Sequence, residues 1–224
     1  MSRTAPLVLL RARLGTVLRV SDESWRRYAL VLVDFQHDFW PDAVMSTAPE
    51  LPVRVDDLLA YACTHDLAVV HVRACFDADG GNWMARYRLL GRIPCIEGTP
   101  GAQTLSFAIE IAGEPVVIKH SFDGFLETEL HQVLAERGIR GLLIAGLVTS
   151  TCVLFTAATA TQLGYLVSVV SDCCSDFEDA HAATLAGYSF VFDTVRSTEI
   201  ADRRAEWNGQ IATMHPGRVD AERR

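Results

Sequence analysis

The chain has 224 residues, of which 50% are hydrophobic, and carries a formal net charge of -8. This length and apolar content suffice for one well-packed α/β domain, and the acidic balance argues against a nucleic-acid partner. The six cysteines show no Cys-x-x-Cys spacing, and the apolar run at residues 7–10 is too short for a secretory core or a membrane span. We therefore expect a cytoplasmic protein that keeps its thiols reduced and has no membrane partner.

The first core strand is predicted just after an N-terminal extension. This extension comprises residues 1–27, and its two apolar runs on either side of Leu14 and Gly15 predict a small hairpin. Residues 29–33 form a continuous run of alanine, leucine and valine, which is typical of a buried parallel strand. Asp34 follows directly. Because open α/β sheets bind ligands beyond the carboxyl ends of their strands, Asp34 is a candidate functional residue.

The next segment predicts a helix and two further strands. The helix is expected at residues 52–65, and the strand that follows it at residues 67–72. The connection 73–113 is long and contains glycine, tryptophan and proline; because long connections are usually functional, we expect it to form a wall of the pocket. A second apolar run at residues 115–118 ends in Lys119, which places a lysine at the end of a predicted strand as well.

The second half of the chain continues the alternation of helices and strands. Its predicted elements are a helix at 126–137, a strand at 142–147, a helix from Cys152 to Leu163, strands at 166–170 and 190–192, and a helix around His181. The alternation predicts a three-layer α/β/α fold with a mainly parallel, doubly wound sheet of about six strands, whose order cannot be counted from the sequence. We assign residues 28–205 to this domain and expect a polar C-terminal tail at residues 206–224.

Cys152 lies where the predicted strand 142–147 turns into a helix. Backbone N–H groups at a helix N-terminus are unpaired and, together with the helix dipole, stabilise a thiolate and the oxyanion formed when that thiolate attacks. Cysteine is also among the most buried residue types, so Cys152 could equally fill a gap in the core. A lone charge after a strand is common in ordinary loops. The combination of Asp34, Lys119 and Cys152, each near the end of a predicted strand, favours catalysis.

Three separated segments resemble the isochorismatase-like cysteine hydrolases, a family that includes nicotinamidases, N-carbamoylsarcosine amidases, ureidoacrylate amidohydrolases and isochorismatase. Residues 29–39 are similar to an apolar strand followed by Asp-x-Gln-x-Asp-Phe, and residues 117–128 are similar to the lysine strand of the family and its Ser-x-x-x-Phe-x-x-Thr turn. Residues 144–153 resemble the nucleophile segment Gly-Val-x-Thr-x-x-Cys-Val. The resemblance covers residues 28–195 in the expected order.

The resemblance implies a mechanism and a set of catalytic residues. Asp34 is expected to accept the proton of Cys152, Lys119 to hold a charge that favours carboxylate and thiolate, and the thiolate to attack a carbonyl carbon. The backbone N–H groups of Val148 and Cys152 are expected to form the oxyanion hole. Family members also carry a non-proline cis peptide before the nucleophile turn, which corresponds here to the bond between Leu147 and Val148.

The segment after the second strand bears on metal binding. Nicotinamidases of this family use an Asp-x-His and a further histidine there, whereas residues 75–83 contain no histidine. We therefore expect a site without metal or other cofactor, and we disfavour nicotinamidase. His71, within the predicted strand, is more typical of a hydrogen-bonded core histidine than of a ligand. Asp77 and Asp79 are more typical of a solvated turn than of a metal pair.

Substrate selection must come from the walls of the pocket, for which the sequence offers five aromatic candidates. These are Phe39, Trp40, Trp83, Phe125 and Phe155, each of which could equally be a core residue. We favour Phe39 and Trp83. His181 could form a hydrogen bond near the site, but as a lone helix histidine it is expected to be structural.

Three functional hypotheses remain open at this stage. The first is an amidohydrolase that forms a thioester with a small carboxamide, carbamoyl or ureido compound. The second is a vinyl-ether hydrolase of the isochorismatase type, which the presence of Cys152 disfavours. The third is a non-catalytic family member with a binding role, which the presence of Asp34 and Lys119 disfavours. For the enzyme we expect a small-molecule substrate and a homo-oligomer, either a dimer or a tetramer.

Overall fold

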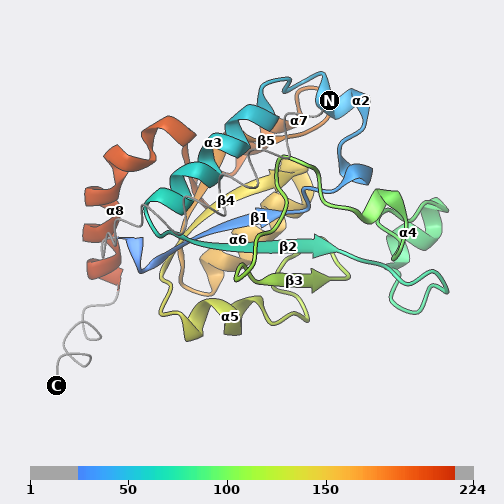
Figure 1. Ribbon diagram of the computed structural model, residues 1–224, viewed down its shortest axis with the longest axis horizontal. Coiled ribbons are helices and arrows are strands. Elements are labelled where there is room, and N and C mark those ends of the chain that lie inside the picture. The colour runs from blue at the N-terminus through green and yellow to red at the C-terminus, as the bar shows by residue number, and fades with distance from the viewer. Residues whose placement is uncertain (1–24, 215–224) are drawn as a thin grey trace.

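The computed structural model describes residues 25–214, which form a six-stranded parallel sheet flanked by helices (Figure 1). The strand order is β3-β2-β1-β4-β5-β6, and every neighbouring pair is parallel. The strands are β1 (Tyr28–Val33), β2 (Ala68–Ala74), β3 (Val116–Lys119), β4 (Gly141–Leu147), β5 (Leu166–Ser175) and β6 (Asp193–Val195). This confirms the predicted α/β fold class with a doubly wound parallel sheet.

Seven α-helices and several short turns connect these strands within the described residues. The helices are α2 (Asp42–Met45), α3 (Leu51–Thr64), α4 (Ala85–Leu90), α5 (Leu130–Glu136), α6 (Leu154–Gln162), α7 (Ala180–Gly187) and α8 (Ile200–Met214). The turns are the 3-10 segments η2 (His37–Phe39), η3 (Pro100–Ala102) and η5 (Ser197–Glu199) and the π-helical turn η4 (Thr149–Val153). None of the helices in residues 25–214 is long and apolar enough to cross a bilayer.

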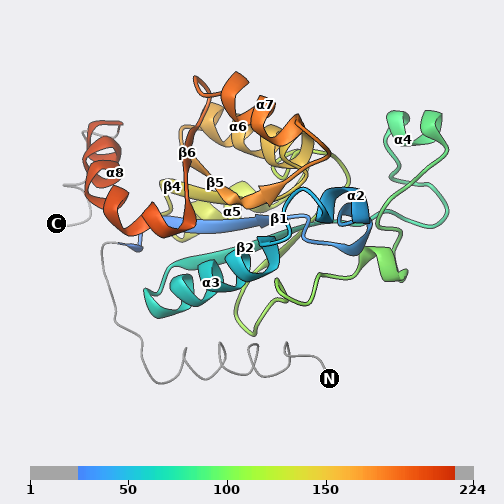
Figure 2. The same cartoon turned by 90° about the horizontal axis from the view of Figure 1, so that it is seen from above.

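The core consists of two apolar layers, one on each face of the sheet. Helices α5 and α6 bury leucines and alanines on one face, and α3 and α8 pack on the other. Figure 2 shows α6 and α7 on one side of the sheet and α3 on the opposite side. Helix α3 illustrates the local cause, because its buried residues recur at helical spacing: Leu51, Val55, Leu58, Leu59 and Ala62. The three-layer arrangement therefore follows from apolar strands covered by amphipathic helices.

Several predicted boundaries require correction. Strand β5 continues to Ser175, well past the predicted end at residue 170, and β6 begins at Asp193 rather than within residues 190–192. Helix α8 extends across the predicted start of the C-terminal tail, because Trp207 and Ile211 are buried against the sheet. Residues 206–214 are therefore helical. The hairpin predicted within residues 1–27 falls almost wholly outside the described part of the chain.

The strand order reverses direction between β1 and β4. The chain runs outward from β1 to β2 and β3, then crosses back to β4 on the other side of β1, so the connections after β1 and β4 lead in opposite directions. Such a reversal separates the two loops and is where open α/β sheets bind ligands. In Figure 1 the arrowheads of β2 and β3 point toward α4, which belongs to the long connection 75–115 and stands beyond the carboxyl edge of the sheet.

Candidate active site

Asp34, Lys119 and Cys152 meet at the carboxyl edge of the sheet. Asp34 directly follows β1, Lys119 is the last residue of β3, and Cys152 lies in η4 just after β4. Lys119 Nζ is 2.7 Å from Asp34 Oδ2 and 3.6 Å from Cys152 Sγ. The three side chains are buried, with exposed fractions of 0%, 1% and 3% for Asp34, Lys119 and Cys152. An acid, a cation and a thiol are thus held together away from bulk water.

The backbone fixes the carboxylate of Asp34. Asp34 has a φ of 52°, a left-handed conformation that aspartate tolerates better than most residues, and this turns the chain sharply at the end of β1. Its Oδ1 accepts a hydrogen bond of 2.9 Å from the backbone N–H of Ala74, the last residue of β2. Its Oδ2 lies 2.7 Å from the ammonium of Lys119. The carboxylate is therefore held between a backbone N–H and a cation.

Lys119 is held as a cation. Its Nζ donates a hydrogen bond of 2.7 Å to the carbonyl oxygen of Ser121, in addition to its contacts with Asp34 and Cys152. Burial by itself would lower the pKa of this ammonium, but the negative charge of Asp34 and the neighbouring sulfur outweigh it, so the pKa of Lys119 is raised. The positive charge is therefore retained wherever the protein is folded near neutral pH.

The thiol of Cys152 is neutral at rest. Burial raises its pKa above the ordinary range, and the charge of Asp34 raises it further, while Lys119 acts in the opposite direction. A neutral thiol is a weak nucleophile, so attack requires a base to take its proton.

The peptide bond between Leu147 and Val148 is cis, as the resemblance predicted. The oxyanion hole at Val148 and Cys152 stays a prediction.

Two polar residues that sequence reasoning left without a role tie this edge to the long connection. Gln36 is fully buried, and its amide donates to the carbonyl oxygens of Ala74 and Ala102, both at 2.8 Å, while its Oε1 accepts from Ala74 N–H at 2.9 Å. Asp38 accepts a hydrogen bond of 2.7 Å from the backbone of Cys95. Both belong to the Asp-x-Gln-x-Asp motif. The motif identifies both residues in the sequence, but it does not show which backbone groups they bind.

An aromatic row connects α4 to the catalytic segments. Phe155, three residues after Cys152, is 46% exposed and stacks on Phe122 with a centroid distance of 6.0 Å. Phe122, three residues after Lys119, meets Tyr87 of α4 edge to face at 5.7 Å. The prediction that the long connection forms a wall, and that Phe155 contributes to it, is consistent with this row. Sequence reasoning missed Tyr87 and Phe122.

The remaining predicted wall residues have different surroundings. Phe39 and Trp83 are partly buried and pack against a small apolar cluster around Phe76, where the Trp83 indole also donates to the carbonyl of Asp77. Trp40 is buried in the main core beside Phe107.

Phe125 is buried in the apolar core, where its ring stacks on Tyr165, the residue just before β5. Its assignment to the pocket wall stays a prediction.

The donor groups near this site do not fit a metal ion. No group of three histidine, cysteine or acidic side chains is gathered in residues 25–214. His71 is 2% exposed and forms an ion-pair contact of 2.8 Å with Glu114, which agrees with the core role predicted for it. Asp79 accepts a hydrogen bond from the backbone of Gly81 two residues later, as in a polar turn. All six cysteines are free, so the adjacent Cys173 and Cys174 are two packed thiols.

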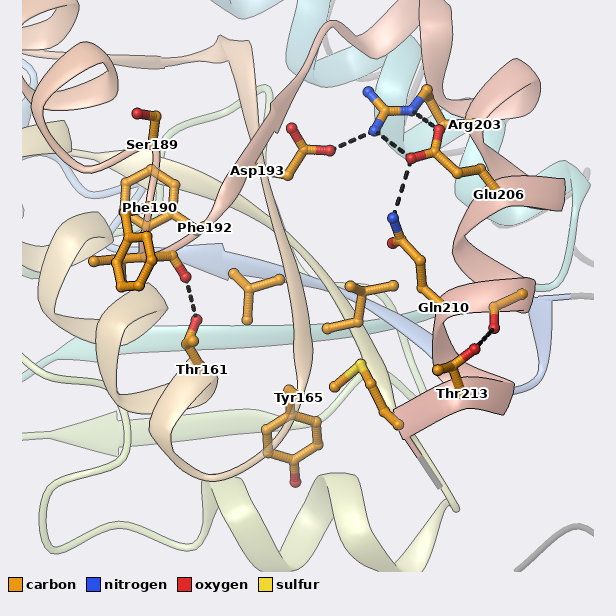
Figure 3. Close-up of a pocket in the computed structure, with 15 residues that line it drawn as sticks. Thr161, Tyr165, Ser189, Phe190, Phe192, Asp193, Arg203, Glu206, Gln210 and Thr213 are labelled. Atoms are coloured by element: carbon orange, nitrogen blue, oxygen red, sulfur yellow. Dashed lines mark hydrogen bonds and ion pairs between the residues drawn. The ribbon is translucent and has the colours of Figure 1, made fainter. Parts of the chain in front are cut away.

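A groove of about 980 Å³ lies elsewhere, at the amino-terminal edge of β5 and β6 (Figure 3). It is lined by residues of α8, such as Arg203 and Gln210, and by Tyr165 and Phe192. None of the three predicted catalytic residues lines it. The ionisable groups therefore point to the carboxyl edge of the sheet and not to this groove.

Comparisons with known proteins agree with this geometry. The model of the isochorismatase domain matches residues 28–200. The maleamate amidohydrolase of Pseudomonas putida is 30% identical over 168 residues, which cover 71% of this chain and 78% of that protein. The crystal structure of an isochorismatase family protein from Desulfovibrio vulgaris has a TM-score of 0.71 and 30% identity, covering 80% of this chain and 99% of that one. The N-carbamoylsarcosine amidase of Thermoplasma acidophilum has a TM-score of 0.64 and 27% identity, covering 76% and 96%.

Proposed function

The chain belongs to the isochorismatase-like hydrolase family, and from this premise we propose that it is a cysteine hydrolase that cleaves a C–N bond in a small amide, carbamoyl or ureido compound. The observation that carries the proposal is the contact of one lysine with both an acid and a thiol, at 2.7 Å and 3.6 Å, inside a buried site. The two similar amidases, maleamate amidohydrolase and N-carbamoylsarcosine amidase, support the choice of C–N bonds.

Acylation is the first half of the proposed reaction. Asp34 takes the proton of the Cys152 thiol as the sulfur attacks the carbonyl carbon, and the carbonyl oxygen becomes an oxyanion that backbone N–H groups of the nucleophile turn stabilise. Collapse of this intermediate re-forms the carbonyl and breaks the C–N bond. The leaving nitrogen takes the proton from Asp34 and departs as ammonia or an amine. A thioester on Cys152 remains.

Deacylation uses the same acid. Asp34, again ionised, takes a proton from water as the water oxygen attacks the thioester carbon, and the sulfur leaves and regains a proton. Lys119 keeps its charge throughout, so that Asp34 alternates between carboxylate and carboxylic acid beside a fixed cation. Because burial raises the pKa of the Cys152 thiol, the proposed reaction needs Asp34 to take the thiol proton during the attack.

Ammonia release is the direct test. The panel begins with maleamate and N-carbamoylsarcosine and extends to biuret and ureido acids, with intact mass spectrometry to detect an acyl adduct on the protein. Release of ammonia by the wild type, and its loss in Cys152→Ala, supports the proposal. Cys152→Ser is the matched variant, since it keeps a weaker nucleophile of similar shape. Turnover by Cys152→Ala at the wild-type rate would refute the covalent mechanism, and isochorismate hydrolysis without an adduct would favour the vinyl-ether reaction.

A further inference from the structure

Asp176 lies directly beside the nucleophile turn because of the way β4 and β5 end together. Leu147, the last residue of β4, pairs with Ser175, the last residue of β5. Between the preceding pairs the register shifts, since two residues along β4 (144 to 146) correspond to five along β5 (169 to 174). This irregularity carries the end of β5 to the turn that follows β4. Asp176 is therefore the first residue beyond β5 and faces η4.

The carboxylate of Asp176 holds a backbone group of that turn. Its Oδ2 accepts a hydrogen bond of 2.6 Å from the N–H of Ser150, one of the N–H groups at the start of a helix that has no helical acceptor. Its Oδ1 accepts from the N–H of Phe177 at 2.7 Å, and its carbonyl accepts from the hydroxyl of Thr47 at 2.9 Å. Asp176 is only 2% exposed. Its backbone carbonyl is thus bonded to Thr47, just after α2, while its buried carboxylate is bonded to the nucleophile turn.

Thr149 provides a second connection between the same segments. Its hydroxyl donates to the carbonyl of Ser175 at 3.1 Å and lies 2.9 Å from His181 Nδ1. Because a hydroxyl has one proton to donate, His181 must donate from Nδ1 to Thr149 Oγ1. Burial lowers the pKa of His181, despite the charge of Asp176, so the neutral imidazole ring is favoured. The role of His181 is therefore structural, as predicted, since its hydrogen bond to Thr149 supports the nucleophile turn.

We propose that Asp176 is a positioning residue for Cys152: by fixing the Ser150 N–H it sets the orientation of the turn Thr149–Val153, and with it the thiol and the backbone groups that receive the oxyanion. The proposal rests on the proposed function, since it concerns the same reaction. Asp176 touches neither the sulfur nor Lys119 through any described contact, so it acts through the turn. A displacement of the turn by a fraction of an ångström would separate Sγ from Lys119 Nζ, now 3.6 Å apart.

Three variants test the proposal. Asp176→Ala removes both acceptors, whereas Asp176→Asn keeps one oxygen that can accept the Ser150 N–H. Asp172→Ala is the matched control: Asp172 lies in β5, and its carboxylate accepts from the N–H of Ser197 at 2.7 Å and from the Ser197 hydroxyl at 2.9 Å, away from the nucleophile turn. Thermal unfolding of each variant verifies that it is folded at the assay temperature.

The expected result is a split between kcat and KM. Asp176→Ala should lower kcat by about 10- to 100-fold, because misplacement of a reacting group by 1 Å or less has effects of that size, with KM changed by less than about threefold. Asp176→Asn should recover most of kcat, and Asp172→Ala should keep it within about twofold. The proposal is wrong if Asp172→Ala loses as much kcat as Asp176→Ala, or if Asp176→Asn is as impaired as Asp176→Ala.

A second measurement needs no substrate. Alkylation of Cys152 by iodoacetamide, followed by peptide mass spectrometry, should be slower in Asp176→Ala than in Asp172→Ala, because reactivity depends on the contacts of Sγ with Lys119 and Asp34. If the wild type releases ammonia from no compound in the panel, the proposed function fails while this comparison still tests the positioning role. Equal or faster alkylation in Asp176→Ala would overturn it.

Discussion

Replacing Lys119 with methionine should cost far more stability than the loss of an ordinary surface charge. Lys119→Met keeps a long apolar side chain but removes the cation that lies 2.7 Å from Asp34 Oδ2. Two unit charges at that distance attract by about 6 kcal/mol at an effective dielectric constant of 20. The hydration that the ammonium regains on unfolding offsets part of this, and breaking a buried pair typically costs about 3–5 kcal/mol. The carboxylate then keeps the N–H of Ala74 as a partner but loses its counter-ion.

A double-mutant cycle separates this pair from general effects of the substitution. In Asp34→Asn/Lys119→Met neither charge remains, so the loss of stability should be smaller than the sum of the two single losses by about 1–3 kcal/mol. Arg203→Met is the control: Arg203 pairs with Asp193 and Glu206 but is 31% exposed, and loss of an exposed pair should cost less than about 1 kcal/mol.

Urea unfolding at pH 7, followed by circular dichroism, gives the required free energies. The variants should share the slope of the wild type, so that shifts of the midpoint report stability. A loss below about 1 kcal/mol in Lys119→Met would refute the reasoning, since it would mean that Asp34 is not held as a charged group by this lysine. Additive losses in the cycle would also contradict it.

Further predictions concern the thiols, a glycine in the sheet and the catalytic acid. Burial raises the pKa of the four buried thiols, so the thiols lose their protons at lower pH in the unfolded chain than in the folded protein. The free energy of unfolding should therefore fall as the pH rises above about 8.5. Urea titrations should show a shallower fall for Cys173→Ala, and a flat pH profile of the wild type would contradict this. Gly146→Ala should destabilise the protein by about 1–3 kcal/mol, because the new Cβ would meet the backbone of β1. Gly209→Ala, on helix α8 where space is open, should stabilise it by about 0.5–1 kcal/mol. Thermal unfolding of the two variants distinguishes these effects. Asp34→Asn should abolish ammonia release, because no acceptor remains for the proton of Cys152, and release at the wild-type rate would remove this acid from the base role.

Most of the fold and the candidate catalytic residues could be predicted because both depend on local patterns. A continuous apolar run such as residues 29–33 is typical of a strand buried on both faces, so its position along the chain is visible in the sequence. Asp34 follows this run, Lys119 ends the strand β3, and Cys152 lies shortly after β4. In a parallel sheet all carboxyl ends lie at one edge, and for this reason the sequence already predicted that the three side chains would gather.

The boundaries that were wrong depend on distant contacts. Helix α8 continues past residue 205 because Trp207 and Ile211 find the face of a sheet formed by much earlier segments. Phe125 and Tyr87 are both aromatic residues in loops or short helices near the site, and composition cannot tell which faces the core. The answer depends on which distant ring each one meets: Phe125 stacks on Tyr165, and Tyr87 meets Phe122.

The amino-acid sequence by itself determined the strands, the apolar helix faces and the three chemical groups near the strand ends. Buried positions recur at a spacing set by the helix or strand, and this spacing is visible in a short stretch of sequence. Only the tertiary structure decided the strand order, the 2.7 Å contact between Lys119 and Asp34, and the hydrogen bond from the Ser150 N–H to Asp176. These depend on register between segments that are far apart in the chain. A shift of register moves a side chain to a different neighbour while leaving every local pattern unchanged.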